Sequence, residues 1–285
     1  MKLWGFEASK VRSLASMNFA FRAGTLATFL AFSVTSALAL PNPPEIIQAK
    51  GGPIKITPIY HASMQIEYRG RVIQVDPFSA GDYTGAKKAD YVLITHTHPD
   101  HLDPKALSQV ATRSTTLIGP QAVIDQMGRL RANPTGKLIT LGNGKSFAVS
   151  SSGQPLFGVE TVPAYNIVRG PKPGQKFHPK GEFNGYILTL GAKRIYIAGD
   201  TEAIPEMKAL KNIDIAFLPM NLPYTMTPQE AATGAKAFKP KVVYPYHYRY
   251  PFDKANDNPQ QFQKALAGSG IQVRLRGWYA YPARK

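Results

Sequence analysis

The chain has 285 residues, a formal net charge of +16 at pH 7 and no cysteine. This length suits one substantial domain or two small ones. Without cysteine the protein has neither disulfides nor thiolate ligands, so any metal site must use histidine, carboxylate or amide side chains. The basic residues are scattered along the chain, which argues against specific nucleic-acid binding. The positive excess suits an anionic substrate, association with an envelope surface, or a merely solvated basic surface.

Residues 1–39 have the layout of a secretory signal peptide. Basic residues precede an apolar run, AGTLATFLAFSVTSALA, that ends in small residues. Ala37 and Ala39 fit the small-x-small rule for cleavage. We therefore expect an exported protein, periplasmic in location, whose mature residues 40–285 form a single domain. An uncleaved membrane anchor is the alternative, because the apolar run is at the short end of what spans a bilayer.

The first part of the mature chain is rich in strand patterns. Residues 53–76 contain three short runs of β-branched and aromatic residues, which predict a β-meander. The continuous apolar run Tyr91–Thr95 predicts a strand that is buried on both faces. Asp103 and Pro104 then have the residue types of a helix N-cap and first helical position, so a helix is expected to begin there.

Strand-like and helix-like segments alternate through the rest of the chain. Strands are expected at residues 115–119, 137–141, 146–150, 156–164, 185–190, 193–198, 213–219, 241–248 and 272–278. Helices are expected at residues 122–130, after Met226 and after Asn258. Thr227 and Glu230 have the spacing of a capping box at the second of these helices. This order favours a layered α/β architecture with sheets inside and helices outside.

The stretch Ile94–Asp103, ITHTHPDHLD, holds three of the six histidines of the chain. Side chains two residues apart on a strand point the same way, so His96 and His98 should converge on one metal ion. The proline that follows turns the chain, and Asp100 and His101 can then present an oxygen and a nitrogen to a second position. The spacing therefore predicts a site for two metal ions.

Two further side chains lie where a predicted strand meets a loop. Asp200 follows the strand KRIYIA, where Gly199 allows a close backbone approach, and His247 ends the strand KVVYPYH. Functional groups are often carried at such positions on a rigid scaffold. For Asp200 the alternative is that its carboxylate merely caps the next helix.

Together these residues resemble the metallo-β-lactamase superfamily, and in particular its branch of ascorbate-phosphate lactonases and the phospholipase D that acts on N-acyl phosphatidylethanolamines. The matching pieces, in chain order, are YHAS at His61, VDP at Asp76, THTHPDHLD, VPAYN at Asn166, AGDT at Asp200, and LPMN, YTMTPQEA and PYHY ending at His247. The resemblance implies a four-layer αββα sandwich with two metal ions in a cleft at the sheet edges.

The resemblance also implies roles for single residues. The first ion would be bound by His96 and His98, and the second by Asp100, His101 and His247. Asp200 would bridge the two ions. Asp76 would orient a ligand imidazole. Asp100 at the second ion, with His61 and Tyr165 as proton donors or substrate contacts, are the expected catalytic residues.

One position departs from the family pattern. Relatives usually have a histidine where this chain has Asn166, and that side chain completes the first metal site. An amide oxygen is a weaker and harder ligand than imidazole. We therefore expect Asn166 to give a weaker site, or a site that prefers manganese or iron. The alternative is a third ligand from elsewhere, and His178 is the remaining unassigned histidine.

The implied chemistry is hydrolysis by a metal-bound hydroxide. Two divalent ions about 3.5–4 Å apart lower the pKa of a shared water toward ~7. The expected metal is Zn²⁺, with Mn²⁺ or Fe²⁺ as alternatives, and the expected target is an ester, lactone, amide or phosphodiester.

A small or lipid-like anionic substrate suits the net charge, and the candidate contacts are Arg169, Lys172, Lys176 and Lys180. Tyr224, Met226 and the aromatic run YPYHYRYPF are candidates for an apolar pocket wall, and the alternative is that they belong to the core. The rival function is a catalytically weak or silent metal-binding envelope protein of the same fold, in which Asn166 has emptied one site.

Overall fold

The computed structural model describes residues 42–130, 133–151, 153–248 and 259–279. The predicted leader, residues 1–39, lies outside these ranges. Within them, no helix combines the length and the apolar character that crossing a membrane requires.

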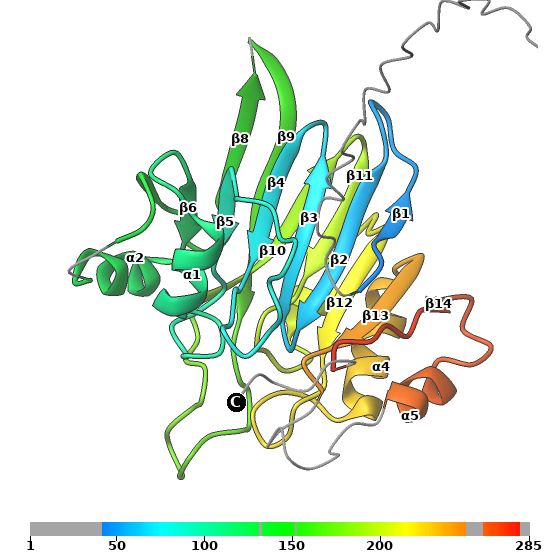
Figure 1. The fold of residues 1–285 in the computed structure, drawn as a ribbon. Coiled ribbons are helices and arrows are strands. Elements are labelled where there is room, and N and C mark those ends of the chain that lie inside the picture. Colours follow the sequence, from blue (N-terminus) through cyan, green and yellow to red (C-terminus); the bar gives the residue numbers. More distant parts are fainter. Residues whose placement is uncertain (1–41, 131–132, 152, 249–258, 280–285) are drawn as a thin grey trace, which may run out of the picture. The chain divides into compact units, whose positions relative to one another are not determined.

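Two mixed sheets of seven strands each are formed by the described residues (Figure 1). In the first sheet the strands follow chain order: β1 (Glu45–Ile47), β2 (Ile54–Tyr60), β3 (Ser63–Tyr68), β4 (Arg71–Val75), β5 (Tyr91–Leu93), β6 (Thr116–Gly119) and β7 (Lys137–Thr140). The second sheet is likewise ordered: β8 (Ser146–Ser151), β9 (Gln154–Ala164), β10 (Phe183–Leu190), β11 (Lys193–Ile197), β12 (Ile215–Pro219), β13 (Val242–Tyr246) and β14 (Gln272–Val273).

Each sheet has antiparallel strands in one half and parallel strands in the other. Strands β1 to β4 are antiparallel and β4 to β7 are parallel. Strands β8 to β11 are antiparallel and β11 to β14 are parallel. The β-meander predicted for residues 53–76 is confirmed as β2, β3 and β4. The strand predicted for residues 272–278 is shorter than expected, because the ladder of β13 with β14 pairs only Gln272 and Val273.

Five helices complete the described part: α1 (Pro104–Val110), α2 (Gln121–Gly128), α3 (Pro205–Lys208), α4 (Pro228–Phe238) and α5 (Pro259–Ala265). The predicted helix starts are confirmed. Asp103 accepts hydrogen bonds from the backbone of Lys105 at 2.8 Å and of Ala106 at 3.3 Å, which caps α1. Thr227 and Glu230 form both halves of the capping box that begins α4.

The main apolar core joins the two sheets, and the helices cover the outer faces. Ile56 of β2 and Leu188 of β10 belong to one buried cluster. Val123 of α2 packs with Val92 of β5 in a second cluster. Phe238 of α4 joins the main cluster from the other side of the second sheet. Burial of apolar surface on both faces of each sheet requires this layering, and the predicted αββα sandwich is confirmed.

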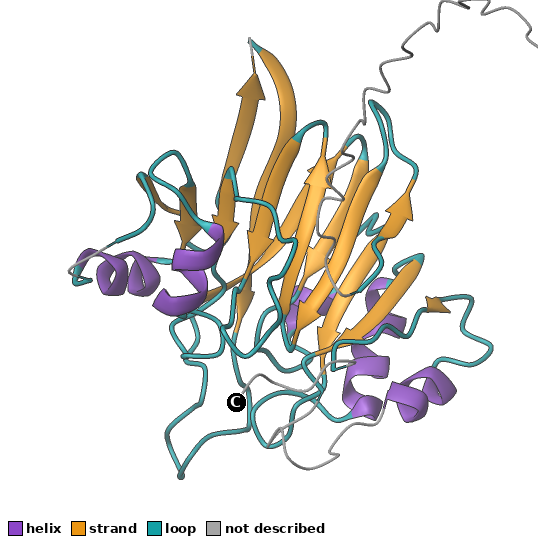
Figure 2. Cartoon of the chain, viewed as in Figure 1, coloured by secondary structure: helices purple, strands orange, loops and turns teal. Residues whose placement is uncertain are grey.

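The parallel strands of both sheets end at one edge of the sandwich, where long loops gather (Figure 2). Strands β4 and β5 are followed by Asp76 and by the segment Thr95–His101, and strands β11 and β13 by Asp200 and His247. Ligands of α/β sheets bind outside the carboxyl ends of the strands. The fold therefore brings all of these residues to one place.

Gly185 of β10 has no room for a side chain. A Cβ atom there would lie 2.6 Å from the carbonyl oxygen of Ala198 and 2.8 Å from that of Ile197. Gly185→Ala is therefore expected to lower the free energy of unfolding by about 1–3 kcal/mol, because the adjacent backbone must shift. Urea denaturation measures the change.

Gly142→Ala is the matched control for this substitution. A Cβ atom at Gly142 would meet no atom within 4 Å, so its free energy of unfolding should stay within about 0.5 kcal/mol of the wild-type value. Equal stability of the two variants would show that the tight contact at Gly185 does not exist.

Candidate metal centre

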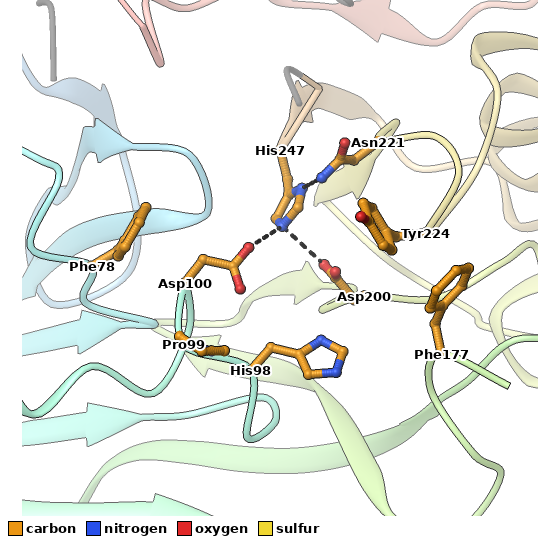
Figure 3. A pocket seen from close by; sticks show the side chains of 9 residues that line it. All are labelled: Phe78, His98, Pro99, Asp100, Phe177, Asp200, Asn221, Tyr224 and His247. Carbon is orange, nitrogen blue, oxygen red and sulfur yellow. Dashed lines mark hydrogen bonds and ion pairs between the residues drawn. The ribbon is translucent and has the colours of Figure 1, made fainter. Parts of the chain in front are cut away.

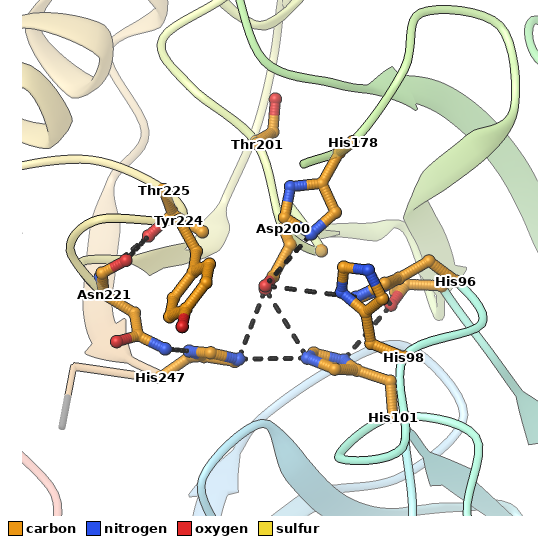
Figure 4. Close-up of polar contacts among 12 residues, drawn as sticks. His96, His98, His101, His178, Asp200, Thr201, Asn221, Tyr224, Thr225 and His247 are labelled. Atoms are coloured by element: carbon orange, nitrogen blue, oxygen red, sulfur yellow. Dashed lines mark hydrogen bonds and ion pairs between the residues drawn. The ribbon is translucent and has the colours of Figure 1, made fainter. Parts of the chain in front are cut away.

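All six histidines of the chain lie at this edge. With two aspartates they form three groups, two of which share His96, and in each group the candidate ligand atoms are within 4.8 Å of one another. The groups are His96, His98 and His178; His61, Asp100 and His247; and His96, His101 and Asp200. Side chains from both sheets and from the loops between them thus converge on one centre (Figure 4).

Asp200 lies between two sets of histidines. Its Oδ2 atom is 3.9 Å from Nε2 of His96 and 3.5 Å from Nε2 of His178. Its Oδ1 atom is 3.6 Å from Nε2 of His101 and 3.4 Å from Nε2 of His247. One carboxylate therefore faces each set with a different oxygen, and Figure 4 shows Asp200 standing between the histidines.

A glycine is needed to place this carboxylate. Gly199 has a φ of 65°, and a Cβ atom there would lie 2.9 Å from the carbonyl oxygen of Asn184 and 3.1 Å from the side chain of Thr95. The close approach that the sequence predicts at Gly199 is thus confirmed, and it brings Asp200 against the segment that carries the histidine motif.

Three imidazoles are held through Nδ1 by an oxygen atom, so that Nε2 is left for the centre, and Nδ1 of a fourth, His247, faces an amide nitrogen. The pairs are His96 with Thr95 Oγ1 at 2.9 Å, His101 with Asp76 Oδ2 at 2.8 Å, His178 with Asn166 Oδ1 at 2.7 Å, and His247 with the amide of Asn221 at 2.9 Å. Ligand histidines are oriented in this way by a second group. His98 differs, because its Nδ1 atom faces Nε2 of His96 at 3.1 Å.

Asp76 connects the first sheet to the histidine motif. Its fully buried carboxylate accepts hydrogen bonds from the backbone N–H of Thr95 at 2.8 Å and from the Thr95 hydroxyl at 2.7 Å. It also contacts Nδ1 of His101. This is the geometry expected of a residue that orients ligand imidazoles, directly for His101 and through Thr95 for His96.

Three residues of this edge have left-handed backbone conformations. The φ angles are 58° at His61, 41° at Asp76 and 49° at His247. Such conformations cost on the order of 1–3 kcal/mol for residues other than glycine, and they concentrate at functional sites. Each of these residues directly follows a strand, so the turn redirects the chain at the sheet edge where the histidines converge.

The donor set suits cations. Nε2 of His178 and Oδ1 of Asp200 are buried without a hydrogen-bond partner in the described protein, and buried polar atoms are normally satisfied. Burial lowers the pKa of His178 to about 4, which leaves its ring neutral. Burial also disfavours charge on His101, but the carboxylates of Asp200, Asp100 and Asp76 outweigh it and raise its pKa to about 10. The centre therefore attracts positive charge and offers free lone pairs.

Asn166 does not present a free oxygen to the centre. Its Oδ1 atom accepts hydrogen bonds from the backbone N–H of His178 at 2.8 Å and from Nδ1 of the same ring. Its Nδ2 atom donates to Glu202 at 3.2 Å and to the carbonyl oxygen of Tyr224 at 2.8 Å. The ligand predicted at Asn166 is therefore corrected. The alternative, His178, lies among the donors, and Asn166 orients it.

Glu202 anchors the loop that holds this pair, and sequence reasoning missed it. Its carboxylate is buried and accepts hydrogen bonds from the backbone N–H groups of Ile167 at 3.1 Å, Val168 at 3.0 Å and Arg169 at 2.7 Å, besides the one from Asn166. A carboxylate that accepts several N–H groups fixes the local backbone. The only local signal was an acidic residue two positions after Asp200.

The two predicted proton donors are placed differently from expectation. His61 contacts Asp100 Oδ2 through Nε2 at 3.0 Å and the Tyr279 hydroxyl through Nδ1 at 2.6 Å. Burial and the neighbouring His247 lower the pKa of His61 to about 3, so the ring is neutral and can orient Asp100. The Tyr165 hydroxyl donates to Glu206 at 2.8 Å, and Tyr165 does not line the pocket described below. The geometry supports neither residue as a proton donor to a leaving group.

A pocket of about 390 Å³ opens over the centre (Figure 3). It is lined by Phe78, His98, Pro99, Asp100, Phe177, Asp200, Asn221, Tyr224 and His247. Tyr224 was expected from the sequence to line an apolar wall, and it does so, whereas Met226 is buried in the main core. Phe78 and Phe177 were missed, because nothing in the local pattern distinguishes a pocket-lining aromatic side chain from a core one. Asn221 ends the quoted motif LPMN, but nothing in the sequence pattern placed its side chain in the pocket.

The basic residues expected to contact an anionic substrate have other partners. The guanidinium of Arg169 binds Glu230 with distances of 2.9 and 2.7 Å. The Lys180 ammonium is 3.3 Å from Glu206, and Lys176 donates to the carbonyl oxygen of Val168 at 2.9 Å. None of these residues, nor Lys172, lines the pocket. The described pocket therefore gives no support to the predicted basic contacts.

Comparison with known proteins agrees with this architecture. Residues 55–247 match the family described as the beta-lactamase superfamily domain. A UPF0173 metal-dependent hydrolase of Anoxybacillus flavithermus is 30% identical over 236 residues, which cover 78% of this chain and 97% of that protein. Another of that name from Thermococcus onnurineus is 32% identical and covers 77% of this chain and 95% of its own length.

Solved structures give the same result. A protein of Parabacteroides distasonis, whose name places it with the metal-dependent hydrolases, is 44% identical with a TM-score of 0.71, over 82% of this chain and 98% of that one. A metallo hydrolase of Ignicoccus hospitalis is 25% identical with a TM-score of 0.62, over 78% and 94%. The chain belongs to the metallo-β-lactamase superfamily. It is a metal-dependent hydrolase of that fold.

Asn166→Ala removes the oxygen that holds the His178 ring. We expect the affinity for Zn²⁺ to fall about 10- to 100-fold, as is usual when a ligand histidine loses its orienting partner. Competition with a chromogenic chelator measures the affinity. Glu182→Ala, an exposed change in the same loop, is the control and should bind as the wild type does. Unchanged affinity in Asn166→Ala would mean that His178 needs no such support.

Proposed function

We propose that the hydrolase works with two divalent ions held side by side. The residues of the first ion are His96, His98 and His178, those of the second are Asp100, His101 and His247, and Asp200 is shared. The observation that carries this proposal is the position of Asp200, whose two oxygens face the two sets of histidines from between them. A site for a single ion would not require a carboxylate divided in this way.

A pair of bound divalent ions supplies a water whose pKa falls toward ~7, and polarises the substrate oxygen. The protein's own residues supply position. Asp76, Thr95 and Asn166 hold the imidazoles, and the neutral ring of His61 holds Asp100. Asp100 is a quarter exposed, whereas the buried His101 behind it is closed to solvent. The substrate therefore approaches from the side of Asp100, where the pocket opens.

The bond that is cleaved is, in this proposal, that of an ester, lactone or phosphodiester. The motif order that resembles the lactonase and phospholipase D branch supports these three. Zn²⁺ is the metal that we propose first, with Mn²⁺ or Fe²⁺ as alternatives, since imidazole and carboxylate ligands suit all three. Export remains a proposal that rests on the leader-like residues 1–39. The silent metal-binding alternative depended on an empty first site, and the position of His178 removes that reason.

The purified protein is expected to contain about two divalent ions per chain. Elemental analysis by mass spectrometry measures their number and identity. His178→Ala should retain about one ion and lose hydrolysis of chromogenic esters, because the first site then has only two histidines.

Glu182→Ala should keep both ions and full activity. A wild-type protein that saturates at one ion, or a His178→Ala variant that still holds two, would contradict the two-ion proposal.

A further inference from the structure

Aromatic side chains stand on two sides of the polar floor of the pocket. In Figure 3, Phe78 lies on one side, Phe177 and Tyr224 lie on the other, and Asp100 and Asp200 lie between them. These aromatic residues come from three separate loops: after β4, before β10 and between β12 and α4. The pocket above the proposed ions is thus bounded by an aromatic wall on each of two sides.

Both walls are held in place by specific contacts. The rings of Phe177 and Tyr224 meet edge to face with centroids 4.8 Å apart. The backbone of Phe78 donates to the hydroxyls of Tyr83 at 2.8 Å and Ser63 at 3.0 Å, and its ring lies 6.2 Å from that of Tyr60. Aromatic pairs of this kind are stabilising beyond the area they bury. The walls therefore have a defined shape before any substrate arrives.

Most polar side-chain atoms of the lining lie on the floor. They belong to the metal-site residues and to Asn221, whose amide already contacts His247, whereas the Tyr224 hydroxyl belongs to an aromatic wall (Figure 3). Neither lysine nor arginine is among the residues that line the pocket in the described part of the chain. A carboxylate or phosphate placed against the ring of Phe78 or Phe177 would lose its hydration without meeting a cationic side chain, which is costly.

We propose that the pocket takes an uncharged substrate with an apolar group on each side of the bond that is cleaved. The inference rests on the hydrolase function proposed above and narrows its substrate to an uncharged ester or lactone, which excludes the anionic phosphodiester. A volume of about 390 Å³ lies in the range of pockets that enclose a small organic molecule. For an ester, water oxygen bonds to the acyl carbon, the bond to the leaving oxygen breaks, and that oxygen takes a proton, which gives an alcohol and an acid.

A matched pair of esters tests the substrate class. Para-nitrophenyl valerate and mono-para-nitrophenyl glutarate have acyl chains of the same length that end in a methyl group or a carboxylate. We expect kcat/KM of the ion-loaded wild type to be at least about tenfold higher for the valerate, because the carboxylate must be desolvated against the wall. Equal rates, or a preference for the glutarate, would overturn the proposed substrate class and leave the hydrolase function standing.

Binding without turnover tests the wall itself. Benzylacetone is a neutral ketone that has the shape of an ester and no leaving group, and calorimetry measures its affinity for the ion-loaded protein. Phe177→Ala should weaken this binding about tenfold and raise KM for the valerate more than it lowers kcat. Val168→Ala removes a side chain of the same loop that is 75% exposed and does not line the pocket, so it should bind as the wild type does.

The outcomes separate the two proposals. Benzylacetone binding that depends on Phe177, with no hydrolysis of any ester, would support the apolar pocket and refute ester hydrolysis. Ester hydrolysis with benzylacetone binding that is the same in Phe177→Ala and Val168→Ala would refute the pocket and support the hydrolase. Phe78→Ala, on the opposite wall, repeats the test should Phe177→Ala fail to fold, and it should weaken binding of the ketone to a similar degree.

Discussion

The rest of the structure depends on a buried cluster of nitrogen and oxygen lone pairs, whose mutual repulsion only bound cations can offset. Imidazole nitrogens and carboxylate oxygens approach within 4.8 Å of one another in a largely buried space. Burial keeps His178 neutral, whereas the carboxylates of Asp200, Asp100 and Asp76 favour a proton on His101, so the centre both offers lone pairs and attracts positive charge. The fold must therefore supply enough stability elsewhere to hold these groups together. It does so with two packed sheets that share one apolar core, while the metal-site residues lie at one edge.

Both sheets of the sandwich contribute residues that form or orient the metal centre. The first sheet contributes the motif after β5 and, through Asp76, the carboxylate that aligns it. The second sheet contributes Asp200 after β11 and His247 after β13. Because these residues follow parallel strands, the ladders of the sheets set their spacing. A centre built from both sheets exists only when the sandwich is closed, so packing of the core and geometry of the site are coupled.

Much of this could be predicted from local patterns, and the failures share a physical cause. The strands, the caps at Asp103 and Thr227, and the close approach at Gly199 follow from periodicity and turn chemistry within a few residues. His178 could not be placed in this way. It is held by Asn166, twelve positions earlier, across a loop without regular structure. The contact of Tyr165 could not be predicted either, because its hydroxyl donates to Glu206, 41 positions later in the chain.

The loop of residues 166–182 carries both a candidate metal ligand and a residue of the pocket wall. Most donors follow strands, whereas His178 is carried by the same segment that presents Phe177 to the pocket. Glu202 accepts hydrogen bonds from Arg169 and from the amide of Asn166 at the start of this loop. The Asn166 oxygen in turn holds the His178 ring. A displacement of the backbone of this loop would therefore disturb the aromatic wall and the first metal site together. The opposite wall, at Phe78, has no ligand beside it in sequence, so substrate preference can change there while the metal centre stays intact.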